Sequence, residues 1–100
     1  MQGILIQYSY DGDEAIWQQA VDGFLANIAA DSRLKDCFNY RVFQKNEDCT
    51  RVHLGTWDNE DTLGHLQSQP FFKEFAGTLK GMAGDSLVAQ RLTGKALSAL

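Results

Sequence analysis

Basic residues are scarce in this chain of 100 residues. It carries nine Lys and Arg side chains against thirteen Asp and Glu, which gives a formal net charge of −4. Nucleic acids and anionic membranes are bound through basic faces, so neither is expected as a partner. The first basic residue is Arg33, and no apolar run approaches the roughly 18 residues of a membrane span. We therefore expect no secretory signal, and we predict a single domain over residues 1–100 in the cytoplasm.

Cysteine is also scarce, with Cys37 and Cys49 as the two thiols of the chain. A disulfide-stabilised domain of this length usually carries more of them. The hairpin predicted below places the two thiols at opposite ends of a strand, farther apart than the ~7 Å that a bridge spans between Cα atoms. Both thiols are expected to be free.

Motifs for common cofactors are missing as well. Two histidines and two scattered cysteines give no zinc-ligand spacing, so no metal site is predicted. The chain has no glycine-rich phosphate loop and no Gly-x-Ser-x-Gly nucleophile turn. We expect no cofactor, and an enzyme built on this chain would have to work without one.

Apolar residues alternate with polar ones, or cluster with β-branched residues, in four segments. This pattern predicts four strands: Met1–Tyr10, Phe38–Lys45, Thr50–Trp57 and Leu87–Thr93. Helical spacing of apolar residues appears twice between them. It predicts a helix over Asp13–Ala30 and a second helical region that Pro70 divides, with one helix over Thr62–Ser68 and another from Pro70 to a stop at Gly84.

The order of these elements is β-α-β-β-α-β, with a tail from Gly94 to Leu100. This order predicts an α+β, ferredoxin-like sandwich, in which helices cover one face of a four-stranded antiparallel sheet. Even-numbered positions of the first three strands, mostly aliphatic or aromatic, are expected beneath the helices. The opposite face would hold a mixture of polar and apolar side chains: Leu5, Gln7, Ser9, Arg41, Phe43, Arg51, His53 and Trp57. A second copy of the chain would cover such a face, so we expect a homodimer with its sheets face to face.

The segment from Thr56 to Phe75 carries a resemblance to a known family. It places Trp57 at the end of a strand, an acidic linker after it, and then a helix with His65, Ser68 and several aromatic residues. In this arrangement the chain resembles the antibiotic-biosynthesis-monooxygenase-like family of dimeric α+β barrels. The preceding segment, Phe38–Phe43, is similar to the second strand of that family.

The resemblance implies a cavity in each protomer, bounded by the sheet. Some family members oxygenate polycyclic phenols or quinols there without metal or flavin, because the deprotonated substrate donates an electron to O2. Others degrade haem, but Phe75 and its neighbours stand where that branch needs an axial histidine. Two further departures are Gly55, where members often carry Glu, and His53, where some quinone-forming members use Asn.

Three residues are candidates for catalysis: His53, Trp57 and His65. Trp57 either stacks on a flat aromatic substrate or packs in the core. The unperturbed pKa of a histidine, about 6.5, suits His53 as a base that ionises a phenol, and its alternative is a hydrogen-bonded place in a dimer interface. The resemblance places His65 at the end of the cavity, and its alternative is bracing a loop. If the cavity instead lies beneath the helices, Tyr8 and Tyr40 line it and His53 does not.

Further side chains are candidates for binding the substrate: Gln7, Ser9, Arg41, Phe43, Phe71, Phe72 and Arg91. An arginine binds a phenolate or carboxylate, and the alternative is an ion pair with acidic groups across the dimer. Phe71 and Phe72 are adjacent in a helix, so one of them would line the pocket while the other anchors the helix.

These observations leave two functions open. The first is a cofactor-independent monooxygenase of a small phenolic or quinol-type compound, with His53 or His65 as the base and Trp57 positioning the ring. The second is a non-catalytic, stress-associated or small-molecule-binding protein of the same fold. The second is favoured by Gly55 and His53, which leave no complete catalytic constellation. An isomerase or lyase of this fold is a third alternative.

Overall fold

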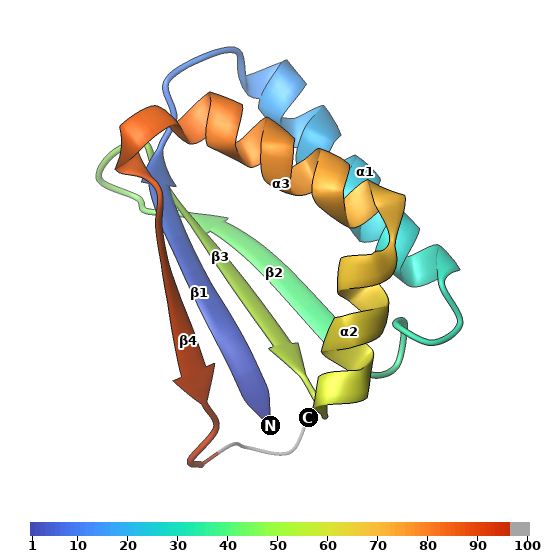
Figure 1. Ribbon diagram of the computed structural model, residues 1–100. Helices are drawn as coiled ribbons and strands as arrows, with labels where there is room; N and C mark the ends of the chain where they lie inside the picture. The colour runs from blue at the N-terminus through green and yellow to red at the C-terminus, as the bar shows by residue number, and fades with distance from the viewer. Residues whose placement is uncertain (97–100) are drawn as a thin grey trace.

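Residues 1–96 form one antiparallel sheet of four strands, and three α-helices pack against a single face of it (Figure 1). The structure, a computed structural model, describes residues 1–96. The elements along the chain are β1 (Gln2–Ser9), α1 (Glu14–Ala30), β2 (Phe38–Gln44), β3 (Thr50–Trp57), α2 (Glu60–Ser68), α3 (Pro70–Ala83), the 3-10 turn η1 (Gly84–Ser86) and β4 (Val88–Thr93). The sheet order is β2-β3-β1-β4, with each neighbouring pair antiparallel. The predicted ferredoxin-like fold is confirmed.

Local sequence signals set the ends of the helices. The carboxylate of Asp13 accepts a hydrogen bond from the N–H of Ile16, which starts α1. Asn59 caps α2 in the same way, so α2 begins slightly before the predicted Thr62. Pro70 separates α2 from α3 as predicted, because proline lacks the N–H that a continuous helix would need there.

The loops and ends of the chain follow the prediction in part. Gly84 ends α3 with a φ of 57°, in the left-handed region that favours glycine. The N–H of Gly94 donates to the carbonyl of Met1 at 2.9 Å, so the start of the predicted tail lies against the first residue. Positions 97–100 of that tail lie outside the described residues. Cys37 and Cys49 are free thiols, as predicted. No helix within residues 1–96 has the length and hydropathy needed to cross a membrane.

The prediction that Arg51, His53 and Trp57 lie on the open face of the sheet was wrong. Their side chains point toward the helices, and each is at most 2% exposed. Residues opposite each other in an antiparallel pair share a face, and His53 lies opposite Ile6, which also faces the helices. Arg91 of β4 lies on this covered face too.

The hairpin between β2 and β3 is the physical reason for this difference. The N–H of Lys45 donates to the carbonyl of Thr50, and the pairing continues with Gln44 opposite Arg51. Even-numbered residues of β2 therefore share a face with odd-numbered residues of β3, whereas the prediction grouped even with even. Alternation separates the residues of a strand into two sets, but the register decides which set is covered.

The open face of the sheet is more apolar than predicted as a result. The following residues lie on it: Leu5, Gln7, Ser9, Arg41, Phe43, Val52, Leu54, Val88 and Leu92. Phe43 is 53% exposed and Val88 is 56% exposed. Apolar side chains gathered at this density on one face are typical of a surface that a partner covers.

Aromatic rings fill the space between the sheet and the helices. Phe24 of α1 stacks on Phe75 of α3 with ring centres 4.0 Å apart, and it meets the edge of the Tyr40 ring at 5.0 Å. Gly55 of β3 lies beneath Tyr40, because a Cβ atom there would be 3.1 Å from a carbon of the Tyr40 ring. The absence of a side chain at Gly55 therefore allows Tyr40 to reach its place.

Gly55→Ala is expected to lower the free energy of unfolding by about 1–3 kcal/mol, because the new methyl group displaces the Tyr40 ring. Gly77→Ala is the matched control. It lies in α3, where a Cβ atom would contact nothing within 4 Å beyond the adjoining backbone of its own helix. Alanine favours the helix, so this control should raise the free energy of unfolding by about 0.4–1 kcal/mol. Denaturant unfolding measures both, and an unchanged stability of Gly55→Ala would contradict the role given to Gly55.

Candidate ligand-binding cavity

A cavity of about 200 Å³ lies between the sheet and the helices. Apolar and aromatic side chains from the three described helices and from β1, β2 and β3 form most of its wall, and Arg91 of β4 adds a charged side chain. The volume is below the roughly 300–1,000 Å³ of pockets for drug-sized ligands. It exceeds the cavity of about 150 Å³ that holds benzene in another protein. The space therefore suits a small aromatic molecule.

The cavity brings together three of the predicted site residues: Trp57, Phe72 and Arg91. It lies beneath the helices, which was the second of the two placements considered from the sequence. Tyr40 lines it, as that placement predicted, and His53 does not. Tyr8 was also predicted to line it, but Tyr8 lies farther along the sheet and is not part of the wall.

Four predicted binding residues lie on the other side of the sheet, away from this cavity. They are Gln7, Ser9, Arg41 and Phe43. Gln7 and Ser9 border a second hollow, which residues of β3 and β4 also line, and the N–H of Ser9 donates to Oγ of Ser86 at 3.0 Å. This hollow is more open than the cavity, and its wall mixes polar and apolar groups.

The two adjacent phenylalanines of α3 occupy different environments. Phe72 lines the cavity, whereas Phe71 lies in the groove between α1 and α3, with its ring centre 5.9 Å from that of Phe24. Lys80, also on α3, is a wall residue that is not among the predicted site residues. Phe72, Ala76 and Lys80 recur every four residues along the helix, so helical spacing from Phe72 could have identified it.

His65 lies outside the cavity wall and braces the loop that follows α1. Its Nε2 is 2.8 Å from Oδ2 of Asp31, and the guanidinium of Arg33 donates to its Nδ1 at 3.3 Å. The hydrogen bond from His65 holds the pKa of the Asp31 carboxyl below its ordinary value. These contacts favour the loop-bracing role of His65 over a catalytic one.

His53 is hydrogen-bonded at both ring nitrogens. Its Nε2 is 2.8 Å from the hydroxyl of Tyr8, and its Nδ1 is 2.7 Å from the hydroxyl of Tyr40. The indole N–H of Trp17 donates to the Tyr8 oxygen at 2.8 Å. Burial lowers the pKa of His53 from 6.5 to about 4, and it raises the pKa of both tyrosines. All three rings are therefore neutral near pH 7.

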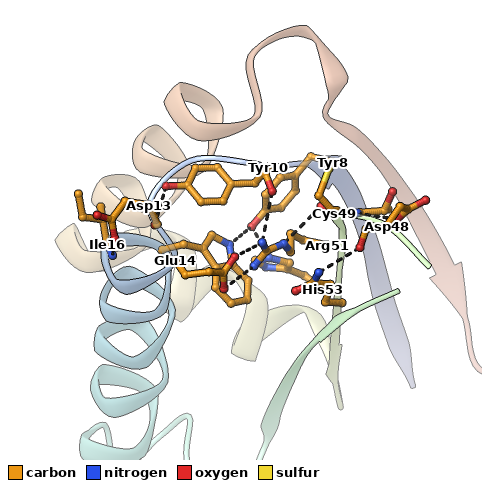
Figure 2. Close-up of polar contacts among 12 residues, drawn as sticks. Tyr8, Tyr10, Asp13, Glu14, Ile16, Asp48, Cys49, Arg51 and His53 are labelled. Carbon is orange, nitrogen blue, oxygen red and sulfur yellow. Dashed lines mark hydrogen bonds and ion pairs between the residues drawn. The ribbon is translucent and has the colours of Figure 1, made fainter. Parts of the chain in front are cut away.

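Arg51 is buried beside this chain of hydrogen bonds (Figure 2). Its guanidinium donates to both carboxylate oxygens of Glu14 and to the carbonyl of Tyr10 at 3.2 Å. Its Nε donates to the carbonyl of Cys49 at 3.3 Å, and its guanidinium carbon lies 4.2 Å from the ring centre of Trp17. Arg51 thus forms its ion pair within its own chain. Its buried guanidinium is hydrogen-bonded to a carboxylate and two carbonyls and also packs on an aromatic ring.

The polar side chains of the cavity wall are mostly hydrogen-bond donors. Nε1 of Trp57 is buried and has no partner among the described residues. The guanidinium carbon of Arg91 lies 5.0 Å from the ring centre of Trp57, and Lys80 supplies a second positive charge. No carboxylate belongs to the wall as residues 1–96 form it. Within the same residues, no cluster of three or more His, Cys, Asp or Glu side chains could hold a metal ion.

Solved structures share this fold at low sequence identity. SnoaB from Streptomyces nogalater, a cofactor-independent oxygenase, is 15% identical with a TM-score of 0.75, over 96% of this chain and 94% of its own. A candidate antibiotic biosynthesis monooxygenase from Deinococcus radiodurans is 16% identical with a TM-score of 0.75, over 100% and 99%. The fold is that of the antibiotic biosynthesis monooxygenase-like proteins.

A third structure shares this monooxygenase-like fold. A dimeric ferredoxin-like protein of unknown function from Jannaschia sp. CCS1 is 16% identical with a TM-score of 0.71, over 93% of this chain and 98% of its own. No protein-family model and no curated protein matches the chain. The likeness therefore establishes the fold and leaves the reaction to depend on the residues of the site.

The low pKa of His53 predicts that stability depends on pH. The unfolded imidazole has a pKa near 6.5 and the folded one a pKa of about 4, so the unfolded state binds more protons between these values. The contribution of His53 to the free energy of unfolding is expected to be fully present above about pH 6.5 and to fall by about 3 kcal/mol as the pH drops to about 4.

Denaturant unfolding of the parent protein and of His53→Gln across this pH range measures the effect. We expect His53→Gln to be less stable than the parent protein near pH 7, because it loses the hydrogen bonds of the imidazole. The difference should shrink toward about pH 4, because the variant has no imidazole to protonate at this position. His65→Gln is the control and should retain the His53 contribution. A difference that stays constant across the range would contradict the neutral, buried state of His53.

Proposed function

We propose that the protein is a homodimer that oxygenates a small phenolic or quinol-type compound, without a cofactor, in the cavity beneath its helices. The cavity carries this proposal, since apolar and aromatic side chains form most of its wall and its volume suits a small ring system. The similarity in fold to SnoaB, a cofactor-independent oxygenase, supports the reaction type. An ionised phenol reduces O2 more readily than a neutral one, so the protein has to bind the ring and stabilise its negative charge.

The wall residues divide between these two tasks. Trp57 and Phe72 would hold the aromatic ring between them. Arg91 and Lys80 would stabilise the negative charge that appears when the phenol loses its proton. Arg91 is available for this role because its carboxylate neighbour Glu60 lies 3.8 Å away, at the long end of an ion pair, and both side chains are more than half exposed. His53 does not reach the ligand and would act through Tyr40.

Oxygen uptake by metal-stripped protein with a panel of hydroquinones, naphthols and anthrones tests the reaction. We expect uptake above the rate of autoxidation. Ala76→Phe fills the cavity from α3 and should lower the rate at least about tenfold. Ala26→Phe, on the exposed side of α1, is the matched control and should leave it unchanged. Uptake that Ala76→Phe leaves intact would show that the reaction does not take place in this cavity.

A non-catalytic protein that binds a small molecule is the second candidate. It is favoured by the position of the two histidines, neither of which contributes to the cavity wall. A protein that binds panel compounds in a manner sensitive to Ala76→Phe, and takes up no oxygen with any of them, would support this candidate over the oxygenase.

The homodimer rests on the open face of the sheet. That face carries six aliphatic or aromatic side chains from all four strands: Leu5, Phe43, Val52, Leu54, Val88 and Leu92. The Jannaschia protein of the same fold is dimeric. A second copy would bury both apolar faces at once, as the symmetric interface of a twofold dimer does.

Light scattering is expected to give the mass of a dimer for the parent protein. Leu54→Arg adds a charge at the centre of the open face, beside Arg41, and should give a monomer because two such faces would repel each other. Ile16→Arg is the control, since Ile16 is an exposed apolar residue on α1, away from the sheet. It should remain dimeric. A parent protein with the mass of one chain would contradict the dimer.

A further inference from the structure

We propose that Tyr40 is the residue that hydrogen-bonds the ligand in the cavity, and that Trp17, Tyr8 and His53 fix it as a hydrogen-bond donor. The cavity then selects aromatic ligands whose inner end carries an acceptor oxygen, such as a ketone, a quinone or a phenolate. This inference deepens the proposed function and rests on it, since it requires a small molecule in the cavity. The order of donors and acceptors in the chain of four side chains carries the argument.

The direction of the chain is set at Trp17. An indole N–H can only donate, so the Tyr8 oxygen is the acceptor of that 2.8 Å bond. Tyr8 is 2% exposed, and the acceptor that its own hydrogen finds among residues 1–96 is Nε2 of His53. A buried hydroxyl hydrogen without an acceptor costs about 1–3 kcal/mol, so Tyr8 donates to His53.

His53 therefore carries its hydrogen on Nδ1. A neutral imidazole has one donor and one acceptor nitrogen, and burial keeps this one neutral. With Nε2 accepting from Tyr8, Nδ1–H donates to the Tyr40 oxygen at 2.7 Å. The hydroxyl hydrogen of Tyr40 is then unused, because no acceptor for it occurs in the described part of the chain.

The charge of Arg51 favours the same direction. Burial raises the pKa of the Tyr8 hydroxyl, and the Trp17 N–H and the positive charge of Arg51 both act against this rise. Both therefore favour electron density on the Tyr8 oxygen, which is the arrangement in which this hydroxyl donates to His53. Arg51 is held in place by Glu14 and by two backbone carbonyls. The polarising charge is thus a fixed part of the structure.

The remaining wall residues complete a site for an acceptor. Trp57 has a buried N–H without a partner among the described residues, and Lys80 and Arg91 can only donate. Gln67 is the one other wall side chain with an acceptor oxygen within residues 1–96. A ligand with acceptor oxygens and no hydroxyl hydrogen can accept a hydrogen bond from each of these donors. A neutral phenol would add one more donor to a wall whose polar groups are mostly donors.

Nitrogen-15 NMR of protein labelled in its histidines tests the direction of the chain. We expect the His53 ring to carry its proton on Nδ1 and to be unprotonated at Nε2. His65 is an internal comparison, because in its neutral form it must donate from Nε2 to Asp31 and accept at Nδ1 from Arg33, the opposite tautomer. A His53 ring protonated at Nε2 overturns the inference, whatever becomes of the proposed reaction.

Binding of 1-tetralone and tetralin, measured by calorimetry, tests the role of Tyr40. The two compounds have the same ring system and differ in one carbonyl oxygen. The parent protein should prefer 1-tetralone by up to about tenfold, the net value of one hydrogen bond. Tyr40→Phe should lose this preference and still bind tetralin. Tyr10→Phe is the control, because its hydroxyl bonds the carbonyl of Asp13 outside the cavity. A preference that survives in Tyr40→Phe overturns the inference.

Trp17→Phe separates positioning from contact. The variant keeps a ring beneath Arg51 but removes the donor that sets the direction, so His53 and Tyr40 can exchange their donor and acceptor roles. We expect a weaker preference for 1-tetralone, an unchanged affinity for tetralin and a mixture of His53 tautomers. If neither compound binds the parent protein, the proposed cavity function fails, while the tautomer of His53 still decides the direction of the chain.

Discussion

The buried imidazole of His53 requires a hydrogen bond at each ring nitrogen, and residues from several elements of the fold provide these bonds. Tyr8 comes from β1 and Tyr40 from β2, the two strands that flank β3, while Trp17 reaches Tyr8 from α1. Unpaired, these polar atoms would each destabilise the folded protein by an amount comparable to a lost hydrogen bond. Their hydrogen bonds instead connect β1, β2, β3 and α1. They also make the position of Tyr40 depend on residues that lie away from the cavity that it lines.

A second buried polar group extends this network to the surface. Arg51 contacts the ring of Trp17 on one side and Glu14 on the other, and Glu14 is the first residue of α1. The side chain of Glu14 is 62% exposed, so it remains well hydrated while it neutralises a guanidinium that is 2% exposed. The stability of the α1 end and the direction of the hydrogen bonds that reach Tyr40 therefore share one residue, Trp17. A substitution in the Arg51–Glu14 pair should therefore alter the hydrogen bonds that reach Tyr40, and a substitution in those hydrogen bonds should alter the pair. The effects of substitutions at neighbouring residues in one network on stability are not additive.

Element order could be predicted from the sequence because its signals are local: period-two alternation, helical spacing, the cap at Asp13 and the break at Pro70. The covered face of β3 could not. Val52 and Leu54 are apolar and His53 is polar, so hydrophobicity alone places the wrong set inside. Burial of His53 is favourable here because its partners come from Tyr8 and Tyr40, 45 and 13 positions away. Such satisfaction depends on strand register, which the hairpin loop decides and no periodicity reveals.

The same network bears on how a protein without a histidine at its cavity wall could ionise a phenol. A site that offers donors and positive charge binds a phenolate more tightly than the neutral phenol, and by linkage it lowers the pKa of the bound phenol. Tyr40, Trp57, Lys80 and Arg91 are groups of this kind, and no carboxylate in the described wall opposes them. The proton can then leave to solvent, and no side-chain base needs to face the substrate. In the proposed reaction, His53 contributes by remaining neutral, because a protonated ring would have no acceptor nitrogen for Tyr8 and the direction of the chain would be lost.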